Sequence, residues 1–115
     1  IWGTGKPKRE FLYVDDMARA AIHLMNINIK MYNSQISSML SHINVGSGED
    51  LSIKELAEII REVVGFKGKF NFDPTKPDGT PRKFLDSDRI SNLGFKPEIS
   101  LKEGLIATYK DYINS

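Results

Sequence analysis

Apolar residues recur at helical spacing in three stretches of the chain. In the first stretch, Asp15 and Asp16 form a predicted N-cap pair whose charge suits a helix dipole, and the periodic positions continue to about residue 27. The second helix is predicted to begin at a capping box of Ser52 and Glu55, in which each side chain accepts from the other residue's backbone N–H.

The C-terminal third of the sequence contains two further predicted helices. Ser100 and Glu103 form a second capping box, and the helix that they open is expected to continue to about Ile113. A shorter helix is predicted over residues 86–93, capped by its first two residues and ended by Gly94.

The strands predicted from the same pattern are short. Aromatic and β-branched residues, or alternation of apolar and polar positions, mark strands at residues 42–45 and 69–72 and a short strand or extended entry at residues 11–14. Segments without periodicity, or rich in Gly, Pro, Asn and Ser, are predicted loops over 1–9, 28–41 and 73–82. The pattern therefore predicts a small mixed α/β domain over residues 1–115, with too few strands to close a self-sufficient sheet.

Composition narrows the classes of function. A chain of 115 residues is about one domain and buries a small core, so docking against a larger domain would help it. Sixteen basic and fifteen acidic residues leave no basic surplus for nucleic acid. The absence of cysteine excludes disulfides, thiolate nucleophiles and cysteine-ligated zinc, and it fits a cytoplasmic location. No apolar run approaches the ~18 residues of a membrane span.

Common catalytic and cofactor motifs are missing. The turn at residues 46–48 has two glycines, but Leu51 stands where a dinucleotide-binding fingerprint requires a third. No tyrosine is followed four residues later by lysine, and His23 and His42 lack ligand spacing. We therefore predict no catalytic residue, no cofactor-binding residue and no metal ligand in this chain.

Two loops contain the candidate binding chemistry. In the first, Trp2 offers a flat apolar face and Arg9 a planar fork for phosphate. In the second, Asp78 could accept from a sugar or ribose hydroxyl, and Arg82 could meet a phosphate. By chemistry alone, a structural interpretation of each loop is as good as ligand binding. The first loop could be a solvated basic loop with a packed Trp, and the second a turn that Asp78 caps.

Four stretches of the sequence resemble the GDP-L-fucose synthase family, within the extended short-chain dehydrogenase/reductases. They are residues 2–18, 40–46, 76–83 and 99–105, so the resemblance covers essentially the whole chain. The pattern R-E-F-x-x-V-D-D is shared across the superfamily. The pattern P-D-G-T-P-R-K is narrower and points to the fucose synthases.

The resemblance implies an NADP-dependent, homodimeric enzyme that converts GDP-4-keto-6-deoxy-D-mannose to GDP-L-fucose by epimerisation and reduction. The family's Rossmann domain, its Ser-Tyr-Lys set and its acid/base Cys and His have no matching position here. Because the chain also opens at Ile1 without an initiator Met, we expect a C-terminal fragment that binds the GDP-sugar and is inactive alone. Trp2, Arg9 and Asp78 match substrate-binding residues of the family, and we extend a phosphate role to Arg82.

Two alternatives remain open at this point. The chain could be the substrate domain of another nucleotide-sugar epimerase or dehydratase, although the loop at residues 78–82 speaks against this. It could also be a stand-alone binding module. A binding screen of GDP-, UDP- and dTDP-sugars separates the first alternative from a GDP-L-fucose synthase. An upstream reading frame with a Rossmann pattern would exclude the second.

Overall fold

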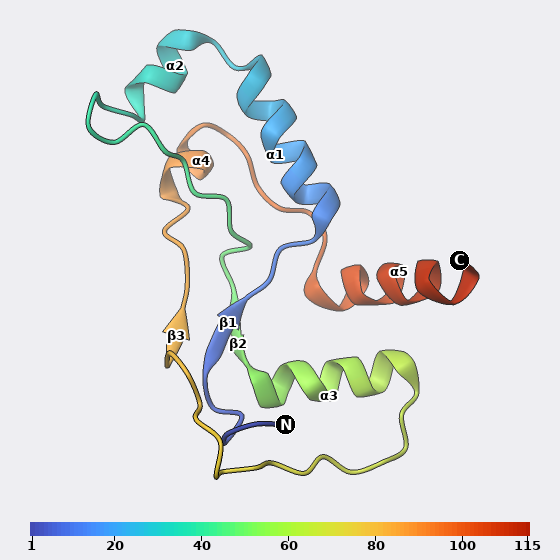
Figure 1. The fold of residues 1–115 in the computed structure, drawn as a ribbon. Coiled ribbons are helices and arrows are strands. Elements are labelled where there is room, and N and C mark those ends of the chain that lie inside the picture. The colour runs from blue at the N-terminus through green and yellow to red at the C-terminus, as the bar shows by residue number, and fades with distance from the viewer.

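The computed structural model describes residues 1–115 and contains five helices and three short strands (Figure 1). In chain order they are β1 (Lys8–Glu10), α1 (Val14–Asn26), α2 (Ile29–Ser34), β2 (Asp50–Ser52), α3 (Ile53–Val64), β3 (Arg82–Lys83), α4 (Asp88–Asn92) and α5 (Leu101–Asn114). The predicted mixed α/β fold class is thereby confirmed. None of the helices is both long and apolar enough to cross a membrane.

Strand β1 lies at the centre of the sheet. It pairs antiparallel with β2 and parallel with β3, so that Arg9 faces Leu51 on one side and Lys83 on the other. The first strand is therefore held from both edges by segments that lie far along the chain. Arg9 occupies the middle position of β1 and has its backbone fixed by this arrangement.

The two predicted capping boxes are confirmed. Glu55 accepts from the backbone N–H of Ser52 at 2.8 Å, and Ser52 accepts from the backbone N–H of Glu55 at 3.1 Å. The same reciprocal pair starts α5 at Ser100 and Glu103. Helix α3 also ends as predicted, at Gly65 in the left-handed conformation.

The entry to the first helix differs from the prediction. The short strand or extended entry predicted at residues 11–14 is not a ladder strand, because the ladder forms at β1 and Val14 already belongs to α1, but the backbone of Tyr13 is extended. Tyr13 is the N-cap residue and makes no side-chain capping bond. Asp15 and Asp16 lie in the first helical turn, so the predicted N-cap pair is also wrong.

Three other predicted segments need correction. The loop expected at residues 28–41 contains α2, which Asn28 caps by accepting from the backbone N–H of Lys30 at 2.8 Å. Residues 42–45 and 69–72 form no ladder. In the first of these segments, apolar side chains pack on the buried core instead. The short helix after residue 86 is shorter than predicted, and Ser87 caps it without a side-chain bond.

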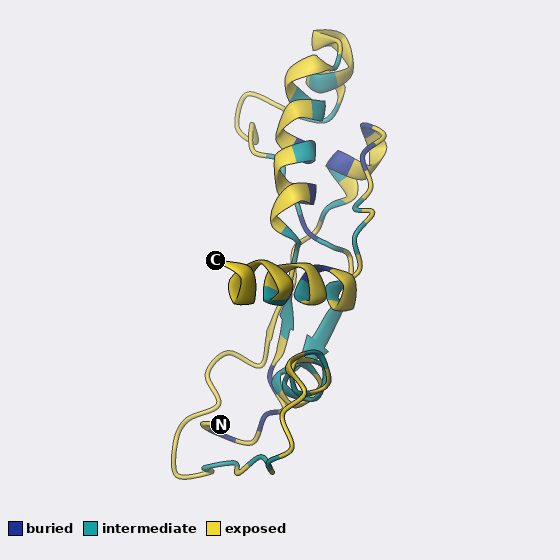
Figure 2. Cartoon of the chain, turned by 90° about the vertical axis from the view of Figure 1, so that its right-hand side faces the viewer, coloured by how far each residue is buried: buried dark blue, intermediate teal, exposed yellow.

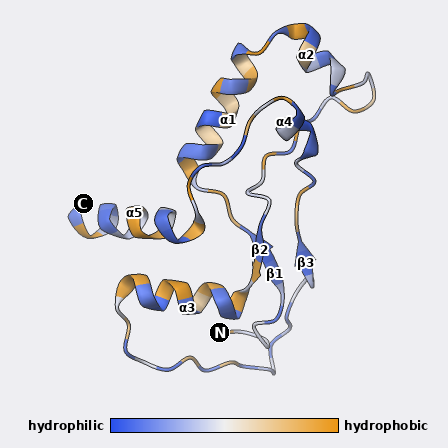
Figure 3. Cartoon of the chain, turned by 180° about the vertical axis from the view of Figure 1, so that it is seen from behind, coloured by the Kyte–Doolittle hydropathy of each residue, from blue (hydrophilic) through white to orange (hydrophobic).

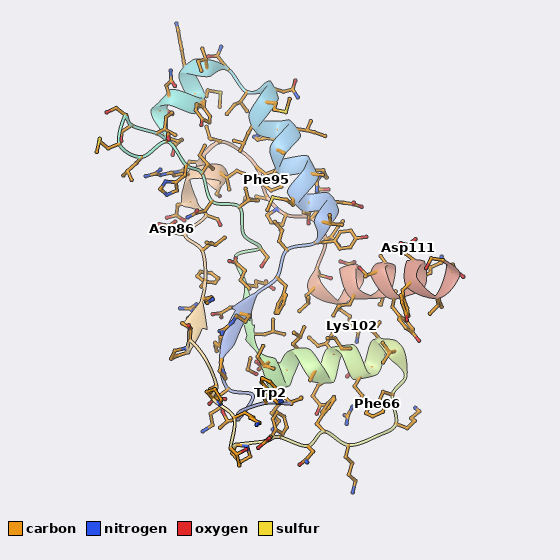
Figure 4. All side chains as sticks on the ribbon, viewed as in Figure 1. Trp2, Phe66, Asp86, Phe95, Lys102 and Asp111 are labelled. Carbon is orange, nitrogen blue, oxygen red and sulfur yellow. The ribbon has the colours of Figure 1, made fainter.

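The buried core is small. Ala20, Ile90 and Phe95 form it where α1 faces α4, as the position of Phe95 in Figure 4 shows. The accessible surface is 8380 Å², whereas a compact monomer of this mass exposes about 6,300 Å². The radius of gyration is 17.4 Å, against about 13 Å for a compact domain of this length. Much of the chain is therefore exposed, as the sparse dark blue of Figure 2 shows.

Many apolar side chains lie on this uncovered surface. Figure 3 shows hydrophobic positions distributed along α1 and α3. Exposed apolar residues on α1 and α5 are Val14, Met17, Ile22, Met25, Ile106, Tyr112 and Ile113. Apolar area of this kind is normally buried against another element or another domain.

Candidate functional site

The two loops singled out from the sequence lie side by side in the structure. The backbone N–H of Gly3 donates to the carbonyl of Asp73, and the N–H of Asp73 donates to the carbonyl of Ile1, both at 2.8 Å. The N–H of Lys8 donates to the carbonyl of Pro81 at 2.8 Å. Residues 1–8 therefore run alongside residues 73–81.

Asp78 connects the loops through its side chain. One carboxylate oxygen accepts from the backbone N–H of Thr4 at 2.5 Å, and the other accepts from the Thr4 hydroxyl at 2.7 Å. These two bonds, and to a smaller extent the charge of Lys6, hold the pKa of Asp78 below its ordinary value. Asp78 is therefore a carboxylate at neutral pH, and a carboxylate of this kind accepts hydrogen bonds.

Arg9 lies half-buried beside the second loop. Its Nη1 donates to the backbone carbonyl of Lys8 at 2.6 Å and to that of Thr80 at 2.8 Å. The Nε and Nη2 groups have no hydrogen-bond partner within the chain. The guanidinium is thus anchored at one nitrogen, and donors on its other nitrogens can meet an anionic ligand.

Trp2 presents its ring to solvent. The residue is 74% exposed, and the Lys76 ammonium lies 5.8 Å from the ring centroid. Figure 4 shows Trp2 near the N-terminus, at the base of the molecule. A large aromatic side chain that covers no core and is held on a paired loop offers a flat surface on which a planar ligand can stack.

Arg82 has a different environment from the other three candidates. It lies on β3, and its guanidinium forms an ion pair with Asp50 of β2 and stacks 4.6 Å from the centroid of the Phe84 ring. The hydrogen bond from Arg82 is the main cause that lowers the pKa of Asp50. The structure thus places Trp2 and Asp78 on the paired loops, Arg9 on β1 instead of the predicted loop, and Arg82 on β3 with a partner within the sheet.

Two residues that the sequence-based reasoning missed hold this region in place. Thr4 binds Asp78, as described above, and no local pattern marks it. Glu10 accepts from the backbone N–H of Gly48 at 2.8 Å and of Leu85 at 3.0 Å. A Cβ on Gly46 would lie 2.4 Å from the Glu10 carboxylate, so glycine at that position permits the approach. In the sequence, only its position directly after Arg9 could have drawn attention to Glu10.

The main cavities of the chain lie away from Trp2, Arg9 and Asp78. One of about 470 Å³ lies between β2 and the first turn of α5, bordered by Phe11, Asp50, Leu101 and Lys102 among others. Another of about 660 Å³ lies between the turn at residues 46–48 and α4. Neither includes Trp2, Arg9 or Asp78. Trp2 and Asp78 are exposed on the paired loops, as residues on one wall of an open cleft would be. No cluster of three His, Asp or Glu side chains is arranged to hold a metal ion.

The fold is similar to that of solved nucleotide-sugar epimerases and reductases. A family model described as the NAD dependent epimerase/dehydratase family matches residues 1–46. The crystal structure of a Campylobacter jejuni GDP-D-glycero-L-gluco-heptose synthase, solved in the presence of NADPH, is 41% identical and superposes with a TM-score of 0.84. That match covers 98% of this chain and 32% of the other. Over residues 1–46 the chain is therefore similar to the NAD dependent epimerase/dehydratase family, and over nearly its whole length it is similar to the C. jejuni enzyme.

The sequence is similar over its whole length to GDP-L-fucose synthases. A probable GDP-L-fucose synthase 1 of Oryza sativa subsp. japonica is 54% identical over 115 residues, and the GDP-L-fucose synthase of Escherichia coli strain K12 is 52% identical. The chain spans 32% and 36% of the lengths of these two relatives. The resemblance inferred from the four sequence stretches is confirmed.

Proposed function

We propose that this chain is the GDP-sugar-binding part of a longer enzyme that converts GDP-4-keto-6-deoxy-D-mannose to GDP-L-fucose. The observation that carries the proposal is the pairing of two loops whose residues match the substrate-binding residues of GDP-L-fucose synthases. Sequence similarity over the full chain to enzymes of that name supports it. The reaction comprises epimerisation followed by NADPH-dependent reduction.

Each candidate side chain has a role that its geometry allows. The exposed Trp2 ring provides a stacking surface for the nucleotide, and Arg9 directs its free Nε and Nη2 donors to the diphosphate. Asp78 retains acceptor capacity beyond its two bonds to Thr4 and accepts from a hydroxyl or a base edge. For Arg82, the proposed phosphate contact requires that its ion pair with Asp50 open or be shared.

The rest of the proposed enzyme lies outside these 115 residues. We propose an N-terminal Rossmann domain that binds NADP(H) and supplies the catalytic residues, in a homodimeric parent enzyme. Two observations support a large partner domain. The chain spans about a third of the length of its GDP-L-fucose synthase relatives, and its accessible surface exceeds that of a compact monomer by about 2,000 Å².

Titration calorimetry with GDP tests the binding role on the complete polypeptide that carries this sequence. Arg9→Ala and Asp78→Ala should each weaken binding, because remote contacts on the nucleotide position the reacting sugar. Arg61→Ala is the matched control, since it removes the same charge from α3, where Arg61 pairs with Glu58. GDP binding that is unchanged in both loop variants would refute the assigned roles.

The choice of nucleotide and sugar is a separate question. A GDP-heptose synthase is among the similar structures, so a shared GDP site with different sugars is the main competing assignment. Parallel titrations with GDP-L-fucose and a GDP-heptose test the sugar, and titrations with UDP-glucose and dTDP-glucose test the nucleotide. Tighter binding of a UDP- or dTDP-sugar than of GDP-L-fucose would assign the chain to another branch of the family.

A further inference from the structure

Thr4 holds both oxygens of the Asp78 carboxylate across a separation of 74 residues in sequence. Its backbone N–H and its hydroxyl each donate to a different oxygen. The Thr4 hydroxyl in turn accepts from the backbone N–H of Lys6 at 3.3 Å, which directs the hydroxyl proton toward Asp78. The side chain of Asp78 is thereby fixed in orientation by one residue of the opposite loop.

The backbone at Gly3 is shaped to permit this contact. Gly3 has a φ of +74°, in the left-handed region that favours glycine. A Cβ at this position would lie 2.2 Å from Oδ1 of Asp78. Any other residue would therefore displace the carboxylate from Thr4. Glycine at position 3 therefore allows the close approach of Asp78 to Thr4.

We propose that Thr4 is a positioning residue of the GDP-sugar site. It fixes the Asp78 carboxylate so that the lone pairs not used by Thr4 face the ligand. A carboxylate has about four lone-pair sites, and Thr4 uses two of them. Because the side chain is already ordered, ligand binding does not have to restrict its rotamers. The inference rests on the proposed binding role of Asp78.

Two substitutions at Thr4, measured on the complete polypeptide with GDP-L-fucose as the probe, test the role. Thr4→Val keeps the size and removes the hydroxyl, so the dissociation constant should rise about tenfold, the lower end of what loss of one hydrogen bond to a charged group costs. Thr4→Ser keeps the hydroxyl and should bind within about twofold of the wild-type protein.

A double-mutant cycle separates positioning from a general structural role. Because Thr4 acts through Asp78, Thr4→Val should have no further effect on affinity in an Asp78→Ala background. Two effects that simply add, or a Thr4→Val variant that binds like the wild-type protein, would overturn the proposal.

A readout that needs no ligand keeps this test distinct from that of the proposed function. Loss of the Thr4 hydroxyl removes one of the two bonds that lower the pKa of Asp78, so Thr4→Val should raise that pKa, while Lys6 and its charge remain. NMR titration of the carboxylate carbon measures it. If the wild-type polypeptide binds no GDP-sugar, the proposed function fails. If the pKa is unchanged in Thr4→Val, the contact itself is refuted. A raised pKa with unchanged affinity would limit Thr4 to a structural role and also overturn the inference.

Discussion

Replacing Asp16 by alanine is expected to destabilise the protein strongly, because its carboxylate is fully buried and joins distant segments. It accepts from the backbone N–H of Glu98 at 3.1 Å and of Ile99 at 2.9 Å, and it pairs with Nη1 of Arg19 at 2.6 Å. These contacts hold the residues that precede α5 against the first turn of α1. Figure 1 shows α5 leaving this junction.

The magnitude follows from the groups that lose their partner. Each of two backbone N–H donors that is left without an acceptor costs about 1–3 kcal/mol when it stays away from water. Arg19 is partly exposed and keeps its ion pair with Glu98, so it adds little. We therefore expect Asp16→Ala to lower the free energy of unfolding by about 3–5 kcal/mol, a large fraction of the ~5–15 kcal/mol of an ordinary domain.

The matched control is the preceding residue. Asp15 carries the same charge in the same helical turn but is exposed, so Asp15→Ala should change stability by at most about 0.5 kcal/mol. Urea denaturation, followed by circular dichroism on the complete polypeptide, measures both variants. Equal losses in the two variants would show that the effect arises from helix-dipole charge, and the argument from burial would fail.

Three further predictions concern other parts of the fold. Gly104→Ala should destabilise the protein by about 1 kcal/mol despite the better helix propensity of alanine, because the added Cβ would lie 2.7 Å from the Tyr13 ring. Thermal unfolding tests the sign of this effect, and a higher melting temperature would contradict it. Ser100→Ala should cost about 1 kcal/mol through loss of the α5 cap, and Ser100→Thr should recover most of it in urea titrations. The pKa of Asp50 is lowered mainly by its hydrogen bond from Arg82, so this stabilisation is present above the unfolded pKa of about 4 and is lost as the pH falls through the lower folded value. Arg82→Ala should therefore flatten the acid limb of the stability profile, and an unchanged limb would refute the pairing.

Elements specified by residues three or four positions apart could be predicted from the sequence. The capping boxes are the clearest case, because Ser52 and Glu55 need only each other to start α3. The strands could not be predicted in this way. The sequence of β1, Lys-Arg-Glu, has no apolar alternation, and its register depends on β2 and β3 far along the chain. Helix α2 has six residues and too little periodicity to recognise.

The same distinction applies to the candidate site. The resemblance to GDP-L-fucose synthases identified Trp2, Arg9 and Asp78 as candidates. The contacts that join the loops were not accessible, because Thr4 with Asp78, and Arg9 with Thr80, are pairs that only the folded chain brings together. The ion pair of Arg82 was missed for the same reason, since its partner lies on β2.

The central position of β1 has a consequence for the order of folding. Its antiparallel pairing with β2 closes a loop of about 40 residues, and its pairing with β3 closes one of about 70. Helices α3 and α5, with their local caps, can form early, whereas these distant pairings lose chain entropy before they gain contacts. The Arg9–Thr80 and Thr4–Asp78 bonds span 71 and 74 residues, so they form only when both ends of that loop have met. Nucleotide affinity would therefore appear late in refolding, after most helical signal has returned, and would report that these two long-range contacts have formed.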